Sequence, residues 1–179
     1  MTAPDGADDF ESRARDRVVE LGDDIDLDTF AAMFDLFRVW SRITRDLENT
    51  VHRPLGLSIA GFRVLFTVWV FDTLEPREIA RLSGVSRAAV TGVVKTLEDD
   101  GLARRSREQA DRRLVTVSVT PAGVAKLREA YVRQNRRERE LFAALSSDEL
   151  TQFTATMRTL LAARSRADGA ADGAHPPNE

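Results

Sequence analysis

The sequence has 179 residues, 42% of them hydrophobic and 31% charged, with a net charge of -3, two histidines and no cysteine. This composition is typical of one folded, soluble domain, and it excludes disulfides, thiolate metal sites and a histidine-rich metal site, so we expect neither a metal nor a cofactor. No apolar run approaches the ~18 residues that span a bilayer, and the acidic start does not have the pattern of a signal peptide, which predicts a cytoplasmic protein without a membrane partner.

Residues 1–27 are predicted to be an acidic N-terminal extension that is partly helical. Ten acidic side chains and three arginines give residues 1–30 a net charge of -7. Within this stretch, Phe10–Leu21 has the pattern of a short helix.

Residues 28–57 are predicted to form a long dimerisation helix. Asp28 is the predicted N-cap, and Pro54 with Gly56 ends the helix after about His52. Apolar residues recur at steps of three, four or seven, which is the spacing of one helix face, at Phe30, Met33, Phe34, Phe37, Trp40, Leu47 and Val51.

A further helix is predicted after Ser58, whose hydroxyl suits an N-cap. The apolar residues predicted to share one face of this helix are Phe62, Leu65, Phe66 and Trp69. This helix opens residues 58–120, which we predict to be a winged helix-turn-helix region.

The segment Glu75–Val94 (EPREIARLSGVSRAAVTGVV) has the spacing of two helices joined by a tight turn. Pro76 begins the first helix, Gly84 supplies the positive φ that the turn requires, and Ser86 caps the second helix, which runs to about Asp100. The residues that would pack the two helices together are Ile79, Ala80, Val85, Val90 and Val93. The pattern predicts a helix-turn-helix, and the alternative is two generic helices joined by a glycine turn.

A two-stranded hairpin is predicted directly after the second helix, which Gly101 ends. Leu102–Arg107 and Leu114–Thr120 have the composition of strands, and the second alternates valine with threonine or serine. The residues between them, Glu108–Arg113, are too polar to be core. A helix-turn-helix followed by a hairpin is a winged helix, so the predicted fold is mainly α with a small β wing.

Residues 121–166 are predicted to form two C-terminal dimerisation helices. Pro121 suits the first position of one helix, and Ser146 with Glu149 forms a capping box for the next. The second helix carries an apolar stripe of Leu150, Phe153, Met157, Leu160 and Leu161. Residues 167–179 have almost nothing to bury and are predicted to be a flexible tail.

The predicted end helices, 28–57 and 121–166, hold more apolar surface than a small helical head between them can cover. A second copy of the chain is the simplest partner for this surface. The sequence therefore predicts a homodimer.

Three motifs of the central region belong together: REIARLSGVSRAAVTGVVKTLEDDGLARR, then DRR at Asp111–Arg113, then VTPAG at Val119–Gly123. With them the sequence resembles the MarR family of transcriptional regulators, over roughly residues 28–165 in helix order and spacing. The resemblance implies a homodimeric repressor that binds a palindromic operator in double-stranded DNA and is released by a small ligand. The overall net charge does not oppose this, because residues 76–113 carry nine basic and six acidic side chains.

The resemblance also implies which residues contact DNA. The second helix of the helix-turn-helix would enter the major groove, and a wing arginine would enter the minor groove, for which Arg112 is the first choice. The implied contacts are Ser86, Arg87, Ala88, Thr91, Lys95, Arg105, Arg107 and Arg112. Asp111 and Arg113 are implied to brace the wing.

A ligand site is implied where the dimer helices meet the head. The residues expected to line it are Phe34, Phe37, Arg38, Trp40, Phe62 and Phe66, with Arg63 as another cation. A small aromatic or phenolic carboxylate fits this set. The alternative is that the aromatic residues are ordinary core, and the lack of cysteine excludes a thiol-based peroxide sensor.

The sequence contains no catalytic constellation and no glycine-rich phosphate loop of useful spacing, so we do not expect an enzyme. Two other classes remain as alternatives to a repressor: a winged-helix module for protein interaction or dimerisation, and a sequence-independent architectural DNA binder. Competition between a palindrome from the protein's own promoter and random DNA separates both from a repressor.

Overall fold

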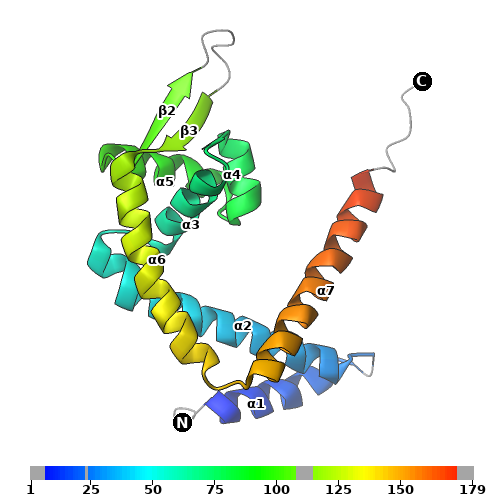
Figure 1. Cartoon of the computed structure of the whole chain (residues 1–179). Helices are drawn as coiled ribbons and strands as arrows, with labels where there is room; N and C mark the ends of the chain where they lie inside the picture. The colour runs from blue at the N-terminus through cyan, green and yellow to red at the C-terminus, as the bar shows by residue number, and fades with distance from the viewer. Residues whose placement is uncertain (1–6, 23, 108–114, 173–179) are drawn as a thin grey trace, which may run out of the picture. The chain divides into compact units, whose positions relative to one another are not determined.

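The structure, a computed structural model, describes residues 7–22, 24–107 and 115–172. The chain divides between residues 132 and 133 into two compact units, which are described separately. Figure 1 shows the elements, which in chain order are α1 (Ala7–Val19), α2 (Leu27–Leu47), the π-helix η1 (Glu48–His52), the 3₁₀ turn η2 (Arg53–Leu55), α3 (Ile59–Val70), β1 (Thr73–Leu74), α4 (Pro76–Ser83), α5 (Arg87–Asp99), β2 (Ala103–Arg107), β3 (Val115–Val119), α6 (Pro121–Phe142) and α7 (Ser147–Asp172).

Helix α1 is the short N-terminal helix that the sequence predicts, and it packs against α2. The ring of Phe10 lies 5.3 Å from that of Phe34, measured between centroids, and Arg38 donates a hydrogen bond to Glu11 at 3.0 Å. The acidic extension therefore contributes a packed helix to the first unit.

The predicted N-cap of α2 is wrong by two residues. Asp26, not Asp28, caps the helix: its carboxylate accepts hydrogen bonds from the backbone N–H of Asp28 at 3.0 Å and of Thr29 at 2.9 Å. The bond from Thr29 is the main reason that the pKa of Asp26 is lowered. Asp28 instead lies in the first turn, where its negative charge interacts favourably with the positive end of the helix dipole.

Helix α2 does not continue as an α-helix to His52. It changes at Glu48 into the π-helix η1, and the following 3₁₀ turn ends at Gly56, which has a φ of 70°. Glu48 Oε2 accepts a hydrogen bond from the Ile59 N–H at 2.6 Å, which fixes η1 to the start of α3. The His52 side chain is fully buried, with its ring 4.7 Å from the Phe62 ring.

Helices α4 and α5 form the predicted helix-turn-helix, and α3 is the predicted helix that precedes it. Ser58 Oγ accepts from the Gly61 N–H at 2.9 Å, Ser86 Oγ accepts from the Ala89 N–H at 3.3 Å, and Gly84 has a φ of 65°. The three helices share a core with the sheet that includes Leu65, Val68, Ile79, Ala80, Val85, Val90, Val94, Leu97 and Val117. The sequence predictions of both caps and of the glycine turn are confirmed.

The predicted apolar face of α3 is partly wrong. Phe62 and Leu65 are buried as predicted, but Trp69 is 48% exposed, and Val64 and Val68 occupy the core instead. Helix α3 contacts α4, α5 and β3, so it buries more than one face. Almost every residue of α3 is apolar, and periodicity alone therefore does not identify its buried side.

The wing is a three-stranded antiparallel sheet rather than the predicted two-stranded hairpin. Strand β3 lies in the centre, with β2 on one side and β1 on the other. Val117 of β3 pairs with Arg105 of β2 and with Leu74 of β1, and its side chain is fully buried. Strand β1 has two residues, too few to show a period of two in the sequence.

Helix α6 begins directly against the start of β2. Thr120 Oγ1 donates to the Gly101 carbonyl at 2.7 Å and accepts from the Gly123 N–H at 3.0 Å, and the Thr120 N–H donates to the Leu102 carbonyl at 3.0 Å. Gly123 is buried so closely that a Cβ there would overlap the Leu102 carbonyl oxygen and lie 2.7 Å from Val119 Cγ1. The glycine permits this close approach.

The capping box before α7 is confirmed. The Ser146 N–H donates to Glu149 Oε2 at 2.8 Å, and the Glu149 N–H donates to Ser146 Oγ at 3.3 Å. The bond from the Ser146 hydroxyl is the main reason that the pKa of Glu149 is lowered. Helix α7 continues to Asp172, into the predicted tail, and residues 173–179 lie outside the described residues.

In the described part of the chain, no single helix has the length and hydropathy of a membrane span. The segments Leu27–Leu55 and Ile59–Val70 meet those two criteria only when taken together, and the pair is bent by 78°. Length and composition are the whole basis of that match.

Candidate nucleic-acid interface

One face of α5 is buried and the opposite face is open to solvent. Val90, Val94 and Leu97 point into the core. The predicted contact residues on the exposed face are Ser86, Arg87, Ala88, Thr91 and Lys95. The structure therefore brings these five residues together on one exposed surface, which we call the α5 face.

The α5 face carries two cations in different surroundings. Lys95 Nζ lies 2.6 Å from Asp99 Oδ2, one helical turn further along, on the exposed surface. Among the residues that the structure describes, no carboxylate lies within ion-pair distance of Arg87. Arg87 occupies the first turn of α5, where the chain enters the helix from the Gly84 turn. Its guanidinium is therefore open to a planar acceptor such as a base edge.

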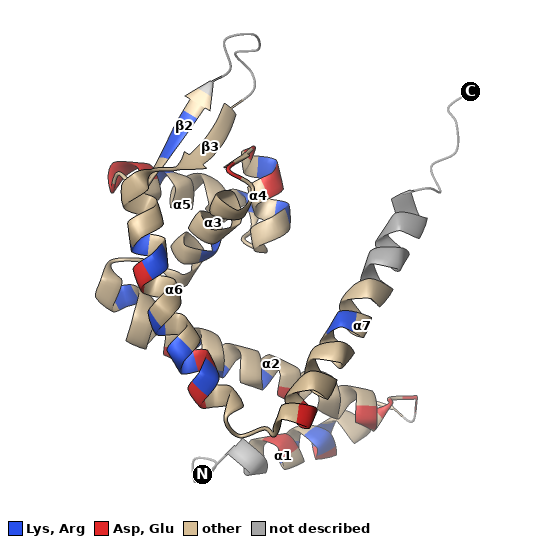
Figure 2. Cartoon of the chain, in the orientation of Figure 1, with Lys and Arg blue, Asp and Glu red and all other residues tan. Residues whose placement is uncertain are grey.

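Two arginines of α4 extend the basic surface, and the sequence prediction did not include them. Arg77 and Arg81 line a shallow depression of about 530 Å³ that also includes Ser86 and Arg87. Arg77 pairs with Glu75 at 3.0 Å, and Arg81 pairs with Glu78 at 2.7 Å. Their spacing of four along α4 was the available sequence signal, because it places both on one helix face. In Figure 2 the ribbon is coloured blue for Lys or Arg on α4 and on β2.

Arg105 of β2 is a predicted DNA contact, and its side chain is held against α5. Its guanidinium lies 3.2 Å from Glu98 Oε2 and donates to the Thr91 carbonyl at 3.3 Å. Its backbone N–H donates to Glu98 Oε1 at 2.9 Å. Glu98 thus binds both the main chain and the side chain of Arg105, and this pair fixes β2 to α5.

The other predicted wing residues lie at or beyond the end of β2. Arg107 is the last residue of this strand, where its backbone pairs with Val115. The predicted minor-groove residue Arg112 and the predicted bracing residues Asp111 and Arg113 lie outside the described residues.

The residues predicted to line a ligand site do not form one cluster. Phe34 and Arg38 belong to the contact between α1 and α2, where Arg38 also lies 5.5 Å from the Phe34 ring. Phe37 and Trp40 are exposed on α2. Phe62 and Phe66 stack with a residue that the prediction did not include, Tyr131 of α6, with centroids 6.5 and 5.8 Å away.

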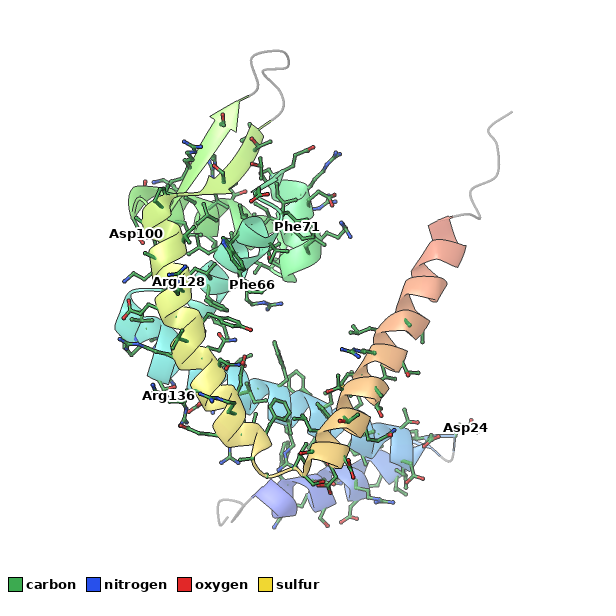
Figure 3. The ribbon with its side chains drawn as sticks, in the orientation of Figure 1. Asp24, Phe66, Phe71, Asp100, Arg128 and Arg136 are labelled. Atoms are coloured by element: carbon green, nitrogen blue, oxygen red, sulfur yellow. The ribbon has the colours of Figure 1, made fainter. Side chains whose placement is uncertain are left out.

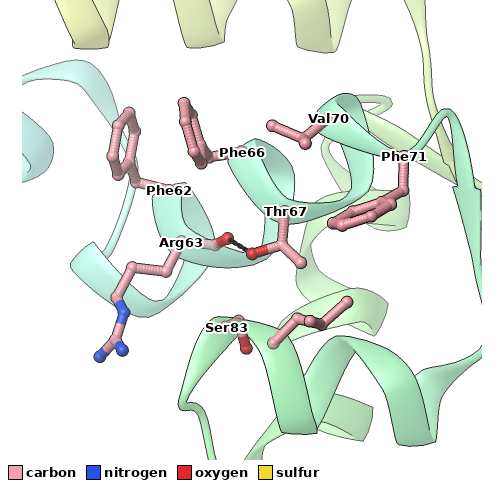
Figure 4. Close-up of a pocket in the computed structure, with 8 residues that line it drawn as sticks. Phe62, Arg63, Phe66, Thr67, Val70, Phe71 and Ser83 are labelled. Carbon is pink, nitrogen blue, oxygen red and sulfur yellow. Dashed lines mark hydrogen bonds between the residues drawn. The ribbon is translucent and has the colours of Figure 1, made fainter. Parts of the chain in front are cut away.

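Among the described residues of the first unit, a cavity and a shallow depression flank α3. The cavity, of about 550 Å³, lies between α3 and α6 and is lined by Phe66, Trp69, Val124, Leu127, Arg128, Tyr131 and Val132. Phe66 of α3 and Arg128 of α6, two of these lining residues, are labelled in Figure 3. The depression, of about 330 Å³, lies between α3 and α4 (Figure 4) and is lined by Phe62, Arg63, Phe66, Thr67, Val70, Phe71, Leu82 and Ser83.

Large apolar side chains remain exposed on the helices predicted to form a dimer. On α2, Phe37 is 69% exposed, and Met33 and Trp40 lie on the same face at helical spacing with more than half of their surface open. On α7 the exposed apolar residues are Leu150, Phe153, Leu160 and Leu161. Exposed apolar faces of this kind on each helix mark interaction surfaces.

A family model described as the MarR family matches residues 57–115, which cover α3, α4, α5 and β2 and reach the start of β3. An uncharacterised HTH-type transcriptional regulator of Bacillus subtilis, YwaE, is 36% identical over 134 residues, 75% of this chain and 78% of YwaE. The HTH-type transcriptional repressor YetL of the same bacterium is 29% identical over 107 residues, 58% of this chain and 60% of YetL.

A solved structure shows the same fold. The structure of BpsR from Bordetella bronchiseptica, whose DNA binding is regulated by 6-hydroxynicotinic acid, matches with a TM-score of 0.67 and 24% identity. The match covers 72% of this chain and 97% of BpsR. At this identity the similarity establishes the shared fold.

Proposed function

This chain belongs to the MarR family of transcriptional regulators, and we propose that it is a homodimeric repressor that binds a palindromic operator and is released by a small ligand. Its relatives and its fold are those of DNA-binding regulators and not of enzymes. In this proposal the α5 face reads base edges in the major groove, and the wing contacts the adjacent minor groove.

The observation that carries the proposal is the α5 face itself. Ser86, Arg87 and Thr91 are exposed polar residues on the first turns of a helix whose other side is locked in the core. A rigid helix with hydrogen-bonding side chains on its N-terminal turns is the arrangement that reads a major groove. A protein-interaction module has no need of this polar and basic surface.

The homodimer is supported by the exposed apolar residues of α2 and α7. Burying a side chain as large as Phe37 or Leu161 stabilises an interface by about 1.5–3 kcal/mol relative to leaving it in water. A two-fold dimer would present two α5 faces, which requires an operator with two related half-sites.

Competition binding tests this function. Labelled DNA containing a palindrome from the protein's own promoter is titrated with the full chain and then challenged with unlabelled palindrome or random DNA at fixed salt. We expect the palindrome to compete at least about a thousandfold better. Equal competition would indicate an architectural DNA binder, and no binding to either DNA would indicate a protein-interaction module.

The Glu98→Ala variant tests whether the wing must be fixed to α5. We expect the free energy of unfolding to fall by about 1–2 kcal/mol, because the variant removes the acceptor of the Arg105 N–H and the partner of its guanidinium. Operator affinity should fall as well, because β2 is no longer held at its angle to α5. Chemical denaturation and operator titration measure the two effects.

The neighbouring Asp99→Ala variant is the matched control. Asp99 is exposed and pairs with the exposed Lys95, so its removal should change the free energy of unfolding by less than about 0.5 kcal/mol. If both variants unfold like the unmodified protein, the contact between Glu98 and Arg105 does not fix the wing.

The Arg112→Ala variant tests the proposed minor-groove contact. Each phosphate-neutralising cation adds about one to the slope of log affinity against log salt, so we expect this slope to fall by roughly 1. Operator titrations at several salt concentrations give the slope. An unchanged slope would mean that Arg112 does not contact DNA.

Release by a small ligand is the third part of the proposal. The cavity between α3 and α6 supports it, because its volume of about 550 Å³ lies within the range of volumes that hold small molecules. In BpsR, the regulating molecule is an aromatic acid. We propose a small aromatic or phenolic carboxylate for this chain.

A further inference from the structure

Most cations of the helix-turn-helix have a carboxylate of their own beside them. Helices α4 and α5, which the structure describes in full, carry four cations, and three of these lie within ion-pair distance of a carboxylate. Arg87 is the exception, since no carboxylate of the described residues lies at that distance from it. The segment from Glu75 to Asp99 holds four basic and four acidic side chains, so its net charge is zero. In Figure 2, red segments accordingly lie beside blue ones on α4.

In both ion pairs of α4 the arginine is more exposed than its carboxylate. The side chains of Arg77 and Arg81 are 67% and 66% exposed, whereas those of Glu75 and Glu78 are 29% and 36% exposed. Arg81 donates two hydrogen bonds to Glu78 Oε2, at 2.9 and 2.7 Å. An ion pair at the surface is weak, so each guanidinium can turn to an acceptor outside the protein while its carboxylate stays behind.

These two arginines flank the residues proposed to read bases. Arg77 and Arg81 line the depression of about 530 Å³ that also includes Ser86 and Arg87. A DNA duplex seated on the α5 face would therefore bring its backbone close to α4. This places two paired cations at the edge of the proposed contact, where a phosphate would be the acceptor outside the protein.

The distance from DNA decides what such a pair contributes. A guanidinium 2.7 Å from a carboxylate has almost no net field beyond a Debye length, which is about 8 Å at physiological salt. A protein that is only loosely attracted to DNA therefore gains little from the pair, and this attraction supplies nearly all sequence-independent binding. A protein whose α5 lies in the groove gains a contact, because the guanidinium then reaches a phosphate directly.

We propose that Glu75 and Glu78 determine specificity, because they cancel the attraction of Arg77 and Arg81 for DNA until α5 is seated on its operator. The two carboxylates then weaken binding to random DNA more than binding to the operator. The inference rests on the proposed function as a sequence-specific DNA-binding regulator. Arg87 needs no release from a carboxylate of the described residues, so the cation of α4 and α5 that is ready to bind is the one proposed to read a base.

The Glu78→Gln variant of the full chain tests this role, because it frees Arg81 and keeps the size of the side chain. At about 0.15 M salt we expect the affinity for random DNA to rise about fivefold for each subunit in contact, which is the effect of one further neutralised phosphate. The slope of log affinity against log salt should steepen by roughly 1 per subunit on random DNA. Operator affinity should rise only about twofold per subunit, since Arg81 contacts a phosphate there in either protein. Titrations of both DNAs at several salt concentrations measure these effects.

The double variant Glu78→Gln/Arg81→Gln removes both charges of one pair. It should bind random DNA within about twofold of the unmodified protein, because a pair with almost no net field is replaced by two neutral side chains. Its operator affinity should fall, because the phosphate contact is lost. A gain on random DNA that persists in the double variant would not come from Arg81 and would overturn the inference.

Asp24→Asn is the matched control, since it removes one exposed negative charge from the link between α1 and α2. It should leave the affinity for either DNA within about twofold of the unmodified protein. If the affinity of Glu78→Gln for random DNA does not rise, or if its operator affinity rises by the same factor, the inference is wrong. An unmodified protein that does not prefer its operator would overturn the proposed function, and the titrations with random DNA would still decide whether Glu78 cancels the attraction of Arg81.

Discussion

Replacing Gly123 with alanine is expected to lower the free energy of unfolding by about 3 kcal/mol or more. The new Cβ would overlap the Leu102 carbonyl oxygen and lie 2.9 Å from its carbonyl carbon, and backbone atoms cannot turn aside as a flexible side chain can. The start of α6 would have to move away, which breaks the hydrogen bonds of Thr120 to Gly101 and Leu102.

Thermal and chemical denaturation at one fixed protein concentration measure this loss. For a chain of this size, about 3 kcal/mol corresponds to a fall in melting temperature of roughly 6–12 °C. Gly92→Ala is the matched control, because Gly92 is also helical and has open space where the Cβ would be. It should stabilise the protein by about 0.5–1 kcal/mol. A Gly123→Ala variant as stable as the unmodified protein would contradict the close approach of α6 to β2.

Replacing Arg87 with alanine is expected to cost about 1–3 kcal/mol of operator binding and to relax the base preference at one position of each half-site. Arg87 lies on the first turn of α5, and its side chain is exposed. A guanidinium in that place can donate two parallel hydrogen bonds to O6 and N7 of a guanine. Titration of operators with each base substituted in turn measures both the affinity and the preference.

Arg53→Ala separates this local contact from the change in net charge. Arg53 is exposed, pairs with Glu48 at 3.3 Å and lies outside the α5 face, so its removal alters the charge equally but should leave base preference unchanged. If Arg87→Ala weakens binding to operator and random DNA by the same factor, Arg87 contacts phosphate and carries no sequence information.

The helix-turn-helix could be predicted from the sequence because its limits depend on local chemistry. The hydroxyls of Ser58 and Ser86 satisfy N–H groups within their own first turns, and Gly84 adopts a positive φ that other residues rarely take. Because each of these capping hydrogen bonds joins residues only three positions apart, it leaves a pattern that can be recognised in the sequence. The exposed α5 face could be predicted from the same pattern, since the buried valines define its opposite side.

The features that the sequence did not predict depend on contacts between distant segments. Strand β1 exists because Leu74 pairs with Val117, more than forty residues away. Nothing local to Phe34 and Arg38 indicates that α1 packs on them. Similarly, nothing local to Arg105 indicates that Glu98 holds it against α5. Charge and aromaticity in a sequence identify groups that need a partner, whereas the fold decides which partner they obtain.

The π-helix η1 joins α2 to the turn before α3, so the number of residues in this connection helps to determine how α3 is oriented relative to α2. An α-helix turns about 100° with each residue, so one residue removed from or added to Glu48–His52 would rotate α3 relative to the exposed face of α2. A substitution in this segment changes only side-chain packing, whereas an insertion or deletion changes the rotation of α3 about its axis relative to α2. Among relatives, a conserved residue count here would therefore carry more information about half-site geometry than conserved residue identity.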